Sequence, residues 1–413
     1  MMGRPVQRIG RLFHIGFSLE ERIPLDHPLR RIEAAVDFSF VRPLVKHVYG
    51  HNGHESLDPT MVLKLLFLCH YENLRSEREL MRQLPLRLDW LWFLGLSIDD
   101  SIPDHSVLSK ARKRWGPELF ERIFEQVIRL CVKAGLVGGA IAHADSTLLK
   151  ANASMEKRVP RILWEQLEAA SDSSPGDAPE DQDSTGPKPS KGADKINARQ
   201  VSPTDPDAAI STRKAGGTTL GYRDHRLVDD RCGIITATVA TPANKDDGAM
   251  LPELLERQTH YTHATPAEVT GDSMYGTLVN YELLKEAGIK PYLKKRRGKD
   301  SPKVSWLKLL PEGCWRDRAI YLLSRRRTRA EGSFAQSHVR MNHRRCRWRG
   351  LKNVQIQCYV VATVQNIKKL ARKAAASRPW GGLRGTIVAA MKSWTCLSAV
   401  FHHPAFTREM MTN

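Results

Sequence analysis

Ala140-Ile-Ala-His-Ala-Asp-Ser-Thr147 is the stretch at which the chain changes from a helical to a strand-like pattern. Upstream of it, apolar residues recur at helix spacing, whereas Ala140 to Ala144, Ile234 to Val239 and Glu268 to Thr270 are short apolar runs typical of buried strands. Helices followed by strands predict an α/β protein with a helical N-terminal domain and a β-sheet domain after it. The length of 413 residues suits two such domains.

The N-terminal helices have readable ends. Ser18-Leu-Glu-Glu21 and Ser76-Glu-Arg-Glu79 are capping boxes, and Pro28 and Pro59 fall where the first turn of a helix tolerates proline. The clearest helix follows Pro117, where the apolar residues form one continuous stripe. We expect this stripe and its neighbours to form the core of the first domain.

A basic segment runs from Asp104 to Trp115, with an aspartate suited to cap a short helix at its start. Lys110, Arg112 and Arg114 lie close together in it. They could face DNA from the second helix of a helix-turn-helix, or they could belong to an ordinary solvated basic helix. The sequence leaves both alternatives open.

A break in composition interrupts the second domain after its first strand. Residues 171–210 contain fifteen Ser, Pro or Gly and eight acidic against four basic residues. Such a segment buries too little apolar surface to offset the entropy lost on ordering. We therefore expect a disordered polar insertion over 171–210.

The net charge of +19 indicates a polyanionic partner, most commonly nucleic acid. Residues 290–349 contain nineteen Lys or Arg against four acidic residues, so most of the excess lies in one segment. A membrane surface is the competing partner, but the chain has no run of 18 apolar residues and its start lacks the apolar core of a signal peptide. The sequence therefore predicts a soluble, cytoplasmic protein and no membrane partner.

The seven cysteines are odd in number and scattered, which predicts reduced thiols and no disulfide framework. The one region that suggests zinc contains His338, His343, Cys346 and Cys358, but its spacing fits no standard zinc template. Ordinary helix and core positions are the more economical interpretation of these four residues.

Three acidic residues are candidates for chemistry: Asp145 and Asp272, each of which follows an apolar strand, and Glu331 in an arginine-rich segment. Carboxylates fixed by a sheet suit hard cations, and three of them can bind two Mg²⁺ ions about 3.5 to 4 Å apart at a phosphodiester. Each also has a simpler interpretation. The aspartates could cap turns, and Glu331 could pair with Arg327 one helical turn earlier.

The order of motifs along the chain resembles the insertion-sequence DDE transposases, specifically the large bacterial group with a helical N-terminal domain and a ribonuclease-H-like catalytic domain. The matching stretches, spread over residues 15 to 372, are Ser18 to Arg31, Leu57 to Lys64, Ile102 to Lys110, Asp145 to Thr147, Ser202 to Ala208, Tyr222 to His225, Val239 to Asn244, Gly271 to Tyr275, Arg327-x-x-x-Glu331 and Gln365 to Leu370. Each motif alone is weak, and their order is the specific feature.

The resemblance implies a fold and its boundaries. Residues 1–136 would form the helical DNA-binding domain, residues 137–372 the ribonuclease-H-like mixed sheet flanked by helices, and residues 373–413 a tail to which we assign no role. Asp145, Asp272 and Glu331 would be the catalytic and metal-binding triad, with two Mg²⁺ ions for which Mn²⁺ could substitute. The expected reaction is cleavage at the ends of an insertion sequence and transfer of the 3′-hydroxyl ends to target DNA.

The resemblance also implies partners: duplex DNA from the element ends and the target, and a second copy of the chain in a paired-end complex in the bacterial nucleoid. Around the glutamate, Arg327 fits the family motif, whereas Ser324 replaces a tyrosine and His338 replaces a lysine. The residues expected to contact DNA are Arg327, His338, Lys294, Lys295, Arg296, Arg297, Arg340, Arg344, Arg345, Lys110, Arg112 and Arg114.

Two rival functions share the basic surface. A decayed or repurposed transposase would bind DNA without cutting it, and Mg²⁺-dependent nicking of an inverted-repeat duplex would distinguish it. An RNA-binding protein would use the arginine-rich stretch alone, and competition between single-stranded RNA and duplex DNA would separate it from both.

Overall fold

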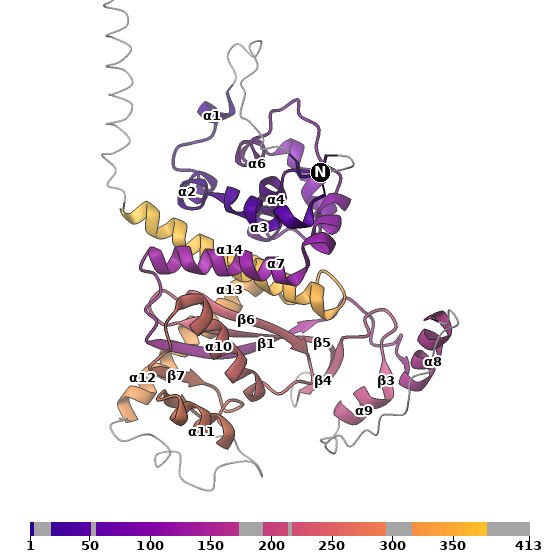
Figure 1. Ribbon diagram of the computed structural model, residues 1–413, viewed down its shortest axis with the longest axis vertical. Coiled ribbons are helices and arrows are strands. Elements are labelled where there is room, and N and C mark those ends of the chain that lie inside the picture. Colours follow the sequence, from indigo (N-terminus) through magenta and orange to yellow (C-terminus); the bar gives the residue numbers. More distant parts are fainter. Residues whose placement is uncertain (4–17, 51–54, 173–192, 214–216, 295–315, 378–413) are drawn as a thin grey trace, which may run out of the picture.

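The computed structural model describes residues 1–3, 18–50, 55–172, 193–213, 217–294 and 316–377. Its N-terminal part is a group of helices, and the strands begin after it (Figure 1). The N-terminal helices are α1 (Leu19–Arg22), α2 (Pro28–Ala35), α3 (Val41–Val45), α4 (Pro59–Tyr71), α5 (Glu77–Gln83), α6 (Leu88–Leu94) and α7 (Ser106–Lys133), with short 3-10 turns at Phe38–Phe40, Lys46–Val48 and Leu84–Leu86.

Local hydrogen bonds explain where several of these helices begin. The Asp58 carboxylate accepts from the backbone N–H of Thr60 at 3.3 Å at the start of α4. The Ser76 hydroxyl accepts from the backbone N–H of Glu79 at 3.2 Å, which confirms the second capping box. The first capping box is not formed, because Ser18 makes no side-chain cap hydrogen bond and α1 is only four residues long.

Helix α7 joins the basic segment to the helix expected after Pro117. Gly116 has φ +66° and ψ 171°, which breaks the helix within α7, and Pro117 starts the second half. The Asp104 carboxylate accepts from the backbone N–H of Ser106 at 2.8 Å, so the expected aspartate cap is present. The second half buries its apolar stripe, as predicted.

Six strands form one mixed sheet: β1 (Ile141–Lys150), β4 (Ala209–Arg213), β5 (Gly217–Asp229), β6 (Ile235–Pro242), β7 (Glu268–Gly271) and β8 (Lys290–Leu293). Strand β5 is antiparallel to β1, β4 and β6, whereas β7 is parallel to β1 and β8. The order β6-β5-β1-β7-β8 places β1 at the centre. The predicted fold class, a helical N-terminal part followed by a ribonuclease-H-like mixed sheet, is confirmed.

Helices flank the sheet on both faces, and the alternation of β1 explains which face carries which residues. Ala142 and Ala144 pack in the core formed with α10 (Leu251–Thr262) and α11 (Leu278–Glu286). Asp145 points to the opposite face and to Arg326. The helices on that side are α12 (Arg316–Arg326), α13 (Gly332–Arg340) and α14 (Leu351–Ser377).

Helix α14 lies along α7, between the other N-terminal helices and the sheet (Figure 1). One hydrophobic cluster contains residues of α4, α7 and α14 together with residues of β5 and β6. The two parts separated by the expected boundary near residue 136 therefore share one core. No helix in the described part of the chain is long and apolar enough to cross a membrane.

The predicted insertion is ordered over part of its length, and the expectation of disorder is wrong for residues 193–210. They contain α9 (Ala193–Arg199), β3 (Gln200–Val201), which pairs with β2 (Val159–Pro160), and the start of β4. The Asn197 amide donates to the Ile210 carbonyl at 2.9 Å and accepts from its N–H at 2.7 Å, which stabilises this segment against the sheet. Helix α8 is Arg161–Asp172, and residues 173–192 and 378–413 lie outside the described residues.

Candidate active site

Asp145 lies on β1, and Asp272 directly follows the neighbouring parallel strand β7. His143 of β1 pairs with Thr270 of β7, and Asp145 and Asp272 each follow two residues later. Because the strands run in the same direction with the same alternation, this register brings the two carboxylates close together. Asp145 lies within β1 and not after a strand as predicted, because β1 continues beside the long strand β5 as far as Lys150.

Glu331 ends a π-helical turn, Arg327–Glu331, which joins α12 to α13. A π turn adds one residue to the helix and is common at functional sites. In an α-helix, residues five apart point about 140° away from each other, whereas i to i+5 is the hydrogen-bonding spacing of a π turn. Glu331 therefore pairs with Arg326, five residues earlier. The simpler interpretation of Glu331 from the sequence, a pair with Arg327, is wrong.

The Arg326 guanidinium joins two of the three predicted carboxylates. Its Nη1 lies 3.3 Å from Oδ1 of Asp145, and its Nη2 lies 2.7 Å from Oε1 of Glu331. The Glu331 side chain is 49% exposed, whereas the Asp145 side chain is 11% exposed. The site therefore opens to solvent on the Glu331 side and is closed by the sheet on the Asp145 side.

Asp145 is the most perturbed of the three acids. Burial raises the pKa of its carboxyl to about 7, and the charges of Asp272 and Glu331 add to that rise, although Arg326 and the Ser146 N–H oppose it. A rise caused partly by Asp272 and Glu331 means that both of these acids lie within electrostatic reach of Asp145. The structure thus brings together the three residues that the sequence singled out.

A buried network that the sequence analysis missed supports this site. His143 contacts the Thr270 hydroxyl at 2.7 Å through Nδ1 and Asp230 at 3.0 Å through Nε2. Asp230 in turn pairs with Arg325 at 2.8 Å. The network connects β1, β7 and α12, the three elements that carry Asp145, Asp272 and Arg326. The only sequence signal was a histidine inside an apolar strand, which usually marks a satisfied core residue.

A second missed group lies beside Asp145. The Arg223 guanidinium donates to both oxygens of Asp247 at 2.8 Å and to the Ser146 hydroxyl at 3.3 Å. Asp247 is 4% exposed, and burial raises the pKa of its carboxyl. Arg223 belongs to the stretch from Tyr222 to His225 that matches the family. Asp247 lies in a loop 102 residues after Asp145, and no pattern in the sequence relates these two aspartates.

Comparison with protein families identifies the chain. Residues 17–114 match the family described as Transposase domain (DUF772), and residues 182–367 match the family described as Transposase DDE domain. The two matches follow the order of the helical part and the sheet, and together they cover more than half of the chain.

The chain belongs to the insertion-sequence DDE transposases. This is a family of DNA-cutting enzymes that generally use divalent metal ions, and a DNA substrate follows from membership. The second match includes Asp272 and Glu331 and begins after Asp145. No curated protein and no solved structure matches the chain.

Several residues predicted to contact DNA are exposed in this transposase. The exposed residues near Glu331 in the sequence are Arg327, Arg340, Arg344 and Arg345. Lys294, directly after β8, is exposed as well. Lys110 and Arg114 are exposed on α7. Lys295, Arg296 and Arg297 fall outside the described residues.

Arg112 is the exception among the predicted DNA contacts. It is 7% exposed, pairs with Glu77, and stacks over the ring of Trp348 at 3.8 Å. Trp348 also packs on the ring of His70, so this tryptophan has a packing role. A guanidinium engaged in this way cannot reach a phosphate without breaking an interior contact, so we remove Arg112 from the expected DNA surface.

His338, which stands where the family has a lysine, lies close to the catalytic strand. Its Nε2 is 3.3 Å from the hydroxyl of Thr147, two residues after Asp145. Burial, reinforced by the nearby cations, lowers the pKa of His338 to about 4. The ring is therefore uncharged at neutral pH, and the position lacks the positive charge that a lysine would supply.

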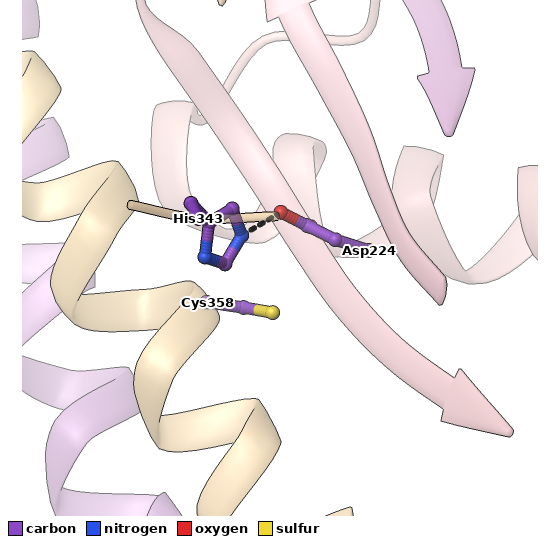
Figure 2. Close-up of side chains that lie close together, drawn as sticks. All are labelled: Asp224, His343 and Cys358. Carbon is purple, nitrogen blue, oxygen red and sulfur yellow. Dashed lines mark hydrogen bonds and ion pairs between the residues drawn. The ribbon is translucent and has the colours of Figure 1, made fainter. Parts of the chain in front are cut away.

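The region considered for zinc forms an interior cluster instead. His343 and Cys358 lie together with Asp224, and their possible ligand atoms are all within 4.8 Å of one another (Figure 2). Asp224 already pairs with Arg226 at 2.8 Å and contacts Nε2 of His343 at 2.9 Å. A guanidinium so close to the carboxylate repels a metal ion.

The protonation of His343 also disfavours an ion there. The Gln357 amide donates to Nδ1 of His343 at 3.1 Å, so the ring proton lies on Nε2 and is donated to Asp224. Neither ring nitrogen then has a free lone pair for a metal. His338 and Cys346 are not members of the cluster. The geometry therefore favours the ordinary core interpretation over the zinc interpretation.

Proposed function

We propose that the chain is an active transposase that binds the terminal inverted repeats of an insertion sequence, cleaves phosphodiester bonds at its ends and transfers the 3′-hydroxyl ends to target DNA. The observation that supports this proposal is the convergence of Asp145, Asp272 and Glu331 on one side of a ribonuclease-H-like sheet. Asp145 lies on β1, Asp272 directly follows the parallel strand β7, and Glu331 on a π turn shares Arg326 with Asp145.

The donor set suits a divalent metal. Carboxylate oxygens are the ligands that Mg²⁺ and Mn²⁺ prefer, and Asp145, Asp272 and Glu331 would supply them. The pKa of Asp145, raised first by burial and further by the charges of the other two acids, supports a role for a cation beside this carboxylate. Two Mg²⁺ ions, for which Mn²⁺ could substitute, would activate the attacking oxygen and stabilise the leaving oxygen.

The residues of the chain would contribute position and charge. The sheet fixes the Asp145 carboxylate, and the His143, Asp230 and Arg325 network holds the helix that carries Arg326 against it. Asp145 must lose its proton to act as an anion. The positive charge of a bound metal ion would favour that loss. Glu331, the most exposed acid of the three, lies nearest to solvent and to an incoming phosphate backbone.

The exposed cations would bind the DNA backbone. Arg344 and Arg345 run beside the end of β1, where the Lys150 N–H donates to the Arg344 carbonyl at 2.9 Å. Five residues of strand span about 17 Å, which is the length of about half a turn of duplex DNA, so this point lies close enough to Asp145 to contact the same duplex. With Arg327, Arg340 and Lys294, these residues would position the duplex with strong salt dependence and little sequence readout.

The test is strand cleavage by purified full-length protein. The substrate is a duplex carrying the inverted repeats that flank the gene, with Mg²⁺ present. Asp145→Asn, Asp272→Asn and Glu331→Gln should each reduce nicking by at least about a thousandfold and leave DNA binding within about threefold. Asp317→Asn, an exposed acid on α12, is the matched control and should cleave normally.

Survival of cleavage in any of the three variants would remove that residue from the site. A wild-type protein that binds the repeats and never nicks them would instead establish the rival, a DNA-binding protein without catalysis. Preference for single-stranded RNA over duplex DNA at fixed salt would contradict both.

We also propose that two copies of the chain join two element ends in a paired-end complex at the nucleoid. The support is the reaction itself, because excision requires both ends to be held together. Light scattering of the protein with a short repeat duplex should give two chains per two duplexes. A particle with the mass of a single chain on a single duplex under cleaving conditions would contradict the paired-end complex.

A further inference from the structure

We propose that Arg326 is an exchangeable counterion of the catalytic carboxylates: it neutralises Asp145 and Glu331 until a divalent cation displaces it, and its freed guanidinium then binds a phosphate of the DNA. This inference rests on the proposed function, because it assumes that the same carboxylates bind the metal. It concerns Arg326 itself, which the family motif does not include.

The geometry carries the first half of the inference. The two Nη atoms of Arg326 contact Oδ1 of Asp145 at 3.3 Å and Oε1 of Glu331 at 2.7 Å. A metal ion bound by both carboxylates would compete with the guanidinium for the same two anionic groups. Because two cations repel each other at such close range, binding of the metal favours the departure of Arg326.

The Arg326 side chain is incompletely satisfied where it lies. It is 12% exposed, and within the described residues its buried Nε has no hydrogen-bond partner. A fully committed structural arginine would use its donors more completely, as Arg223 and Arg257 do with several acceptors each. The contact at 3.3 Å to Asp145 is also longer than a strong charge-assisted hydrogen bond.

The helix around Arg326 lets the guanidinium swing without unfolding. Arg326 is the last residue of α12, directly before the π turn, and a π turn has a looser hydrogen-bonded ring than an α-helix. Arg325 remains paired with Asp230, so the backbone stays anchored when the side chain of Arg326 leaves. The neighbouring Arg327 is exposed, so the chain at this point is open to solvent, into which the Arg326 side chain could move.

The test measures metal binding and not turnover. Mn²⁺ affinity of the full-length protein without DNA is measured by electron paramagnetic resonance for the wild type, Arg326→Gln and Arg327→Gln. Both variants lose one positive charge, one residue apart, but only Arg326 contacts the carboxylates. We expect Arg326→Gln to bind Mn²⁺ on the order of tenfold more tightly than the wild type, and Arg327→Gln to change by less than about threefold.

A second variant guards against misfolding. Arg326→Lys keeps the charge, but its single ammonium cannot bridge both carboxylates as the guanidinium of Arg326 does. The Mn²⁺ affinity of Arg326→Lys should therefore lie between those of the wild type and Arg326→Gln. DNA provides a second readout. Ca²⁺ should raise the affinity of the wild type for duplex DNA, and Arg326→Gln should lose most of that rise.

The outcomes separate the inference from the proposed function. If Arg326→Gln binds Mn²⁺ no more tightly than Arg327→Gln, while Asp145→Asn weakens binding, the counterion exchange is wrong and the metal site stands. If the wild type binds no Mn²⁺, or Asp145→Asn binds it as well as the wild type does, the carboxylate site itself fails, and the exchange fails with it.

Discussion

At the scale of the residue, Asp145 combines burial with two neighbouring acids, and the pKa of its carboxyl rises to about 7. The folded chain therefore binds this proton more tightly than the unfolded chain does. Stability contributed by the neutral carboxyl is present at about pH 4 and is lost as the pH rises to about 7.

The first prediction compares the wild type with Asp145→Asn in EDTA. The free energy of unfolding of the wild type should fall by about 2 to 4 kcal/mol relative to the variant between pH 4 and pH 8. Urea unfolding at several pH values measures the difference. Parallel pH profiles for the two proteins would show that the Asp145 carboxyl is not perturbed in this way.

The second prediction concerns His338, whose lowered pKa leaves it uncharged at neutral pH. His338→Lys should add one phosphate contact and steepen the dependence of log K on log salt by about 0.9. This slope is measured by fluorescence anisotropy with duplex DNA at several NaCl concentrations between about 50 and 300 mM. His260→Lys adds the same charge on α10, at the opposite face of the sheet, and should leave the slope unchanged.

The three acids could be found from sequence because each stands in a recognisable context: a strand, a strand end and a basic helix. Their partners could not. Arg326 was one of several adjacent arginines, and the π turn that selects it over Arg327 leaves no mark in composition. Asp230 and Asp247 act through contacts between residues distant in the chain, which local pattern does not encode.

At the scale of the element, β6 is an edge strand that α14 covers with amide side chains. Asn366 accepts from the Ile235 N–H at 2.9 Å and donates to its carbonyl at 2.8 Å. Gln355 does the same for β6 further along, at the Ala240 N–H and the Thr238 carbonyl. These bonds protect an edge that would otherwise pair with another chain.

The third prediction follows from this edge. Asn366→Ala should destabilise the protein by about 2 to 4 kcal/mol, because it leaves two buried backbone groups of Ile235 without partners. Asn353→Ala on the same helix is the control and should cost less than about 0.5 kcal/mol, since its amide is exposed and bonds only to the Arg349 carbonyl. Equal losses in chemical denaturation would contradict the role of Asn366.

Elements with strong local patterns were predicted, and those with buried polar residues were not. The stripe of α7 and the apolar runs of β6 and β7 match the structure within a few residues. The apolar pattern does not predict strand β5, because Asp224 and Arg226 are buried there as an ion pair and interrupt that pattern. The ordered part of the insertion depends on Asn197, a single tertiary clamp in a polar segment.

At the scale of the whole molecule, the length and the change from a helical to a strand-like pattern predicted two domains, and one hydrophobic cluster contains residues from both parts of the chain. Helix α14 belongs to the catalytic half by sequence and to the core of the N-terminal helices by packing. The net charge of +19 predicted a polyanionic partner for the molecule, and its location in residues 290–349 pointed to the part that contains Glu331.

The fourth prediction is that helices and sheet unfold together. Hydrogen exchange should report the same free energy of opening for α4 and for β1 in rising urea, because both lose the shared core in one step. Residues 18–136 expressed alone should lack a cooperative transition. A fragment that unfolds cooperatively by itself would restore the two-domain division at residue 136.

The position of α14 has a consequence for the folding of the nascent chain on the ribosome. The apolar surface of α4 and α7 that α14 covers is synthesised more than 200 residues before α14 itself, a delay on the order of 10 to 50 s at bacterial elongation rates. During that interval the nascent helices expose the surface to chaperones and proteases. A chain terminated before Leu351 never closes it, so truncated messages should yield proteolytic fragments and not folded competitors for the element ends.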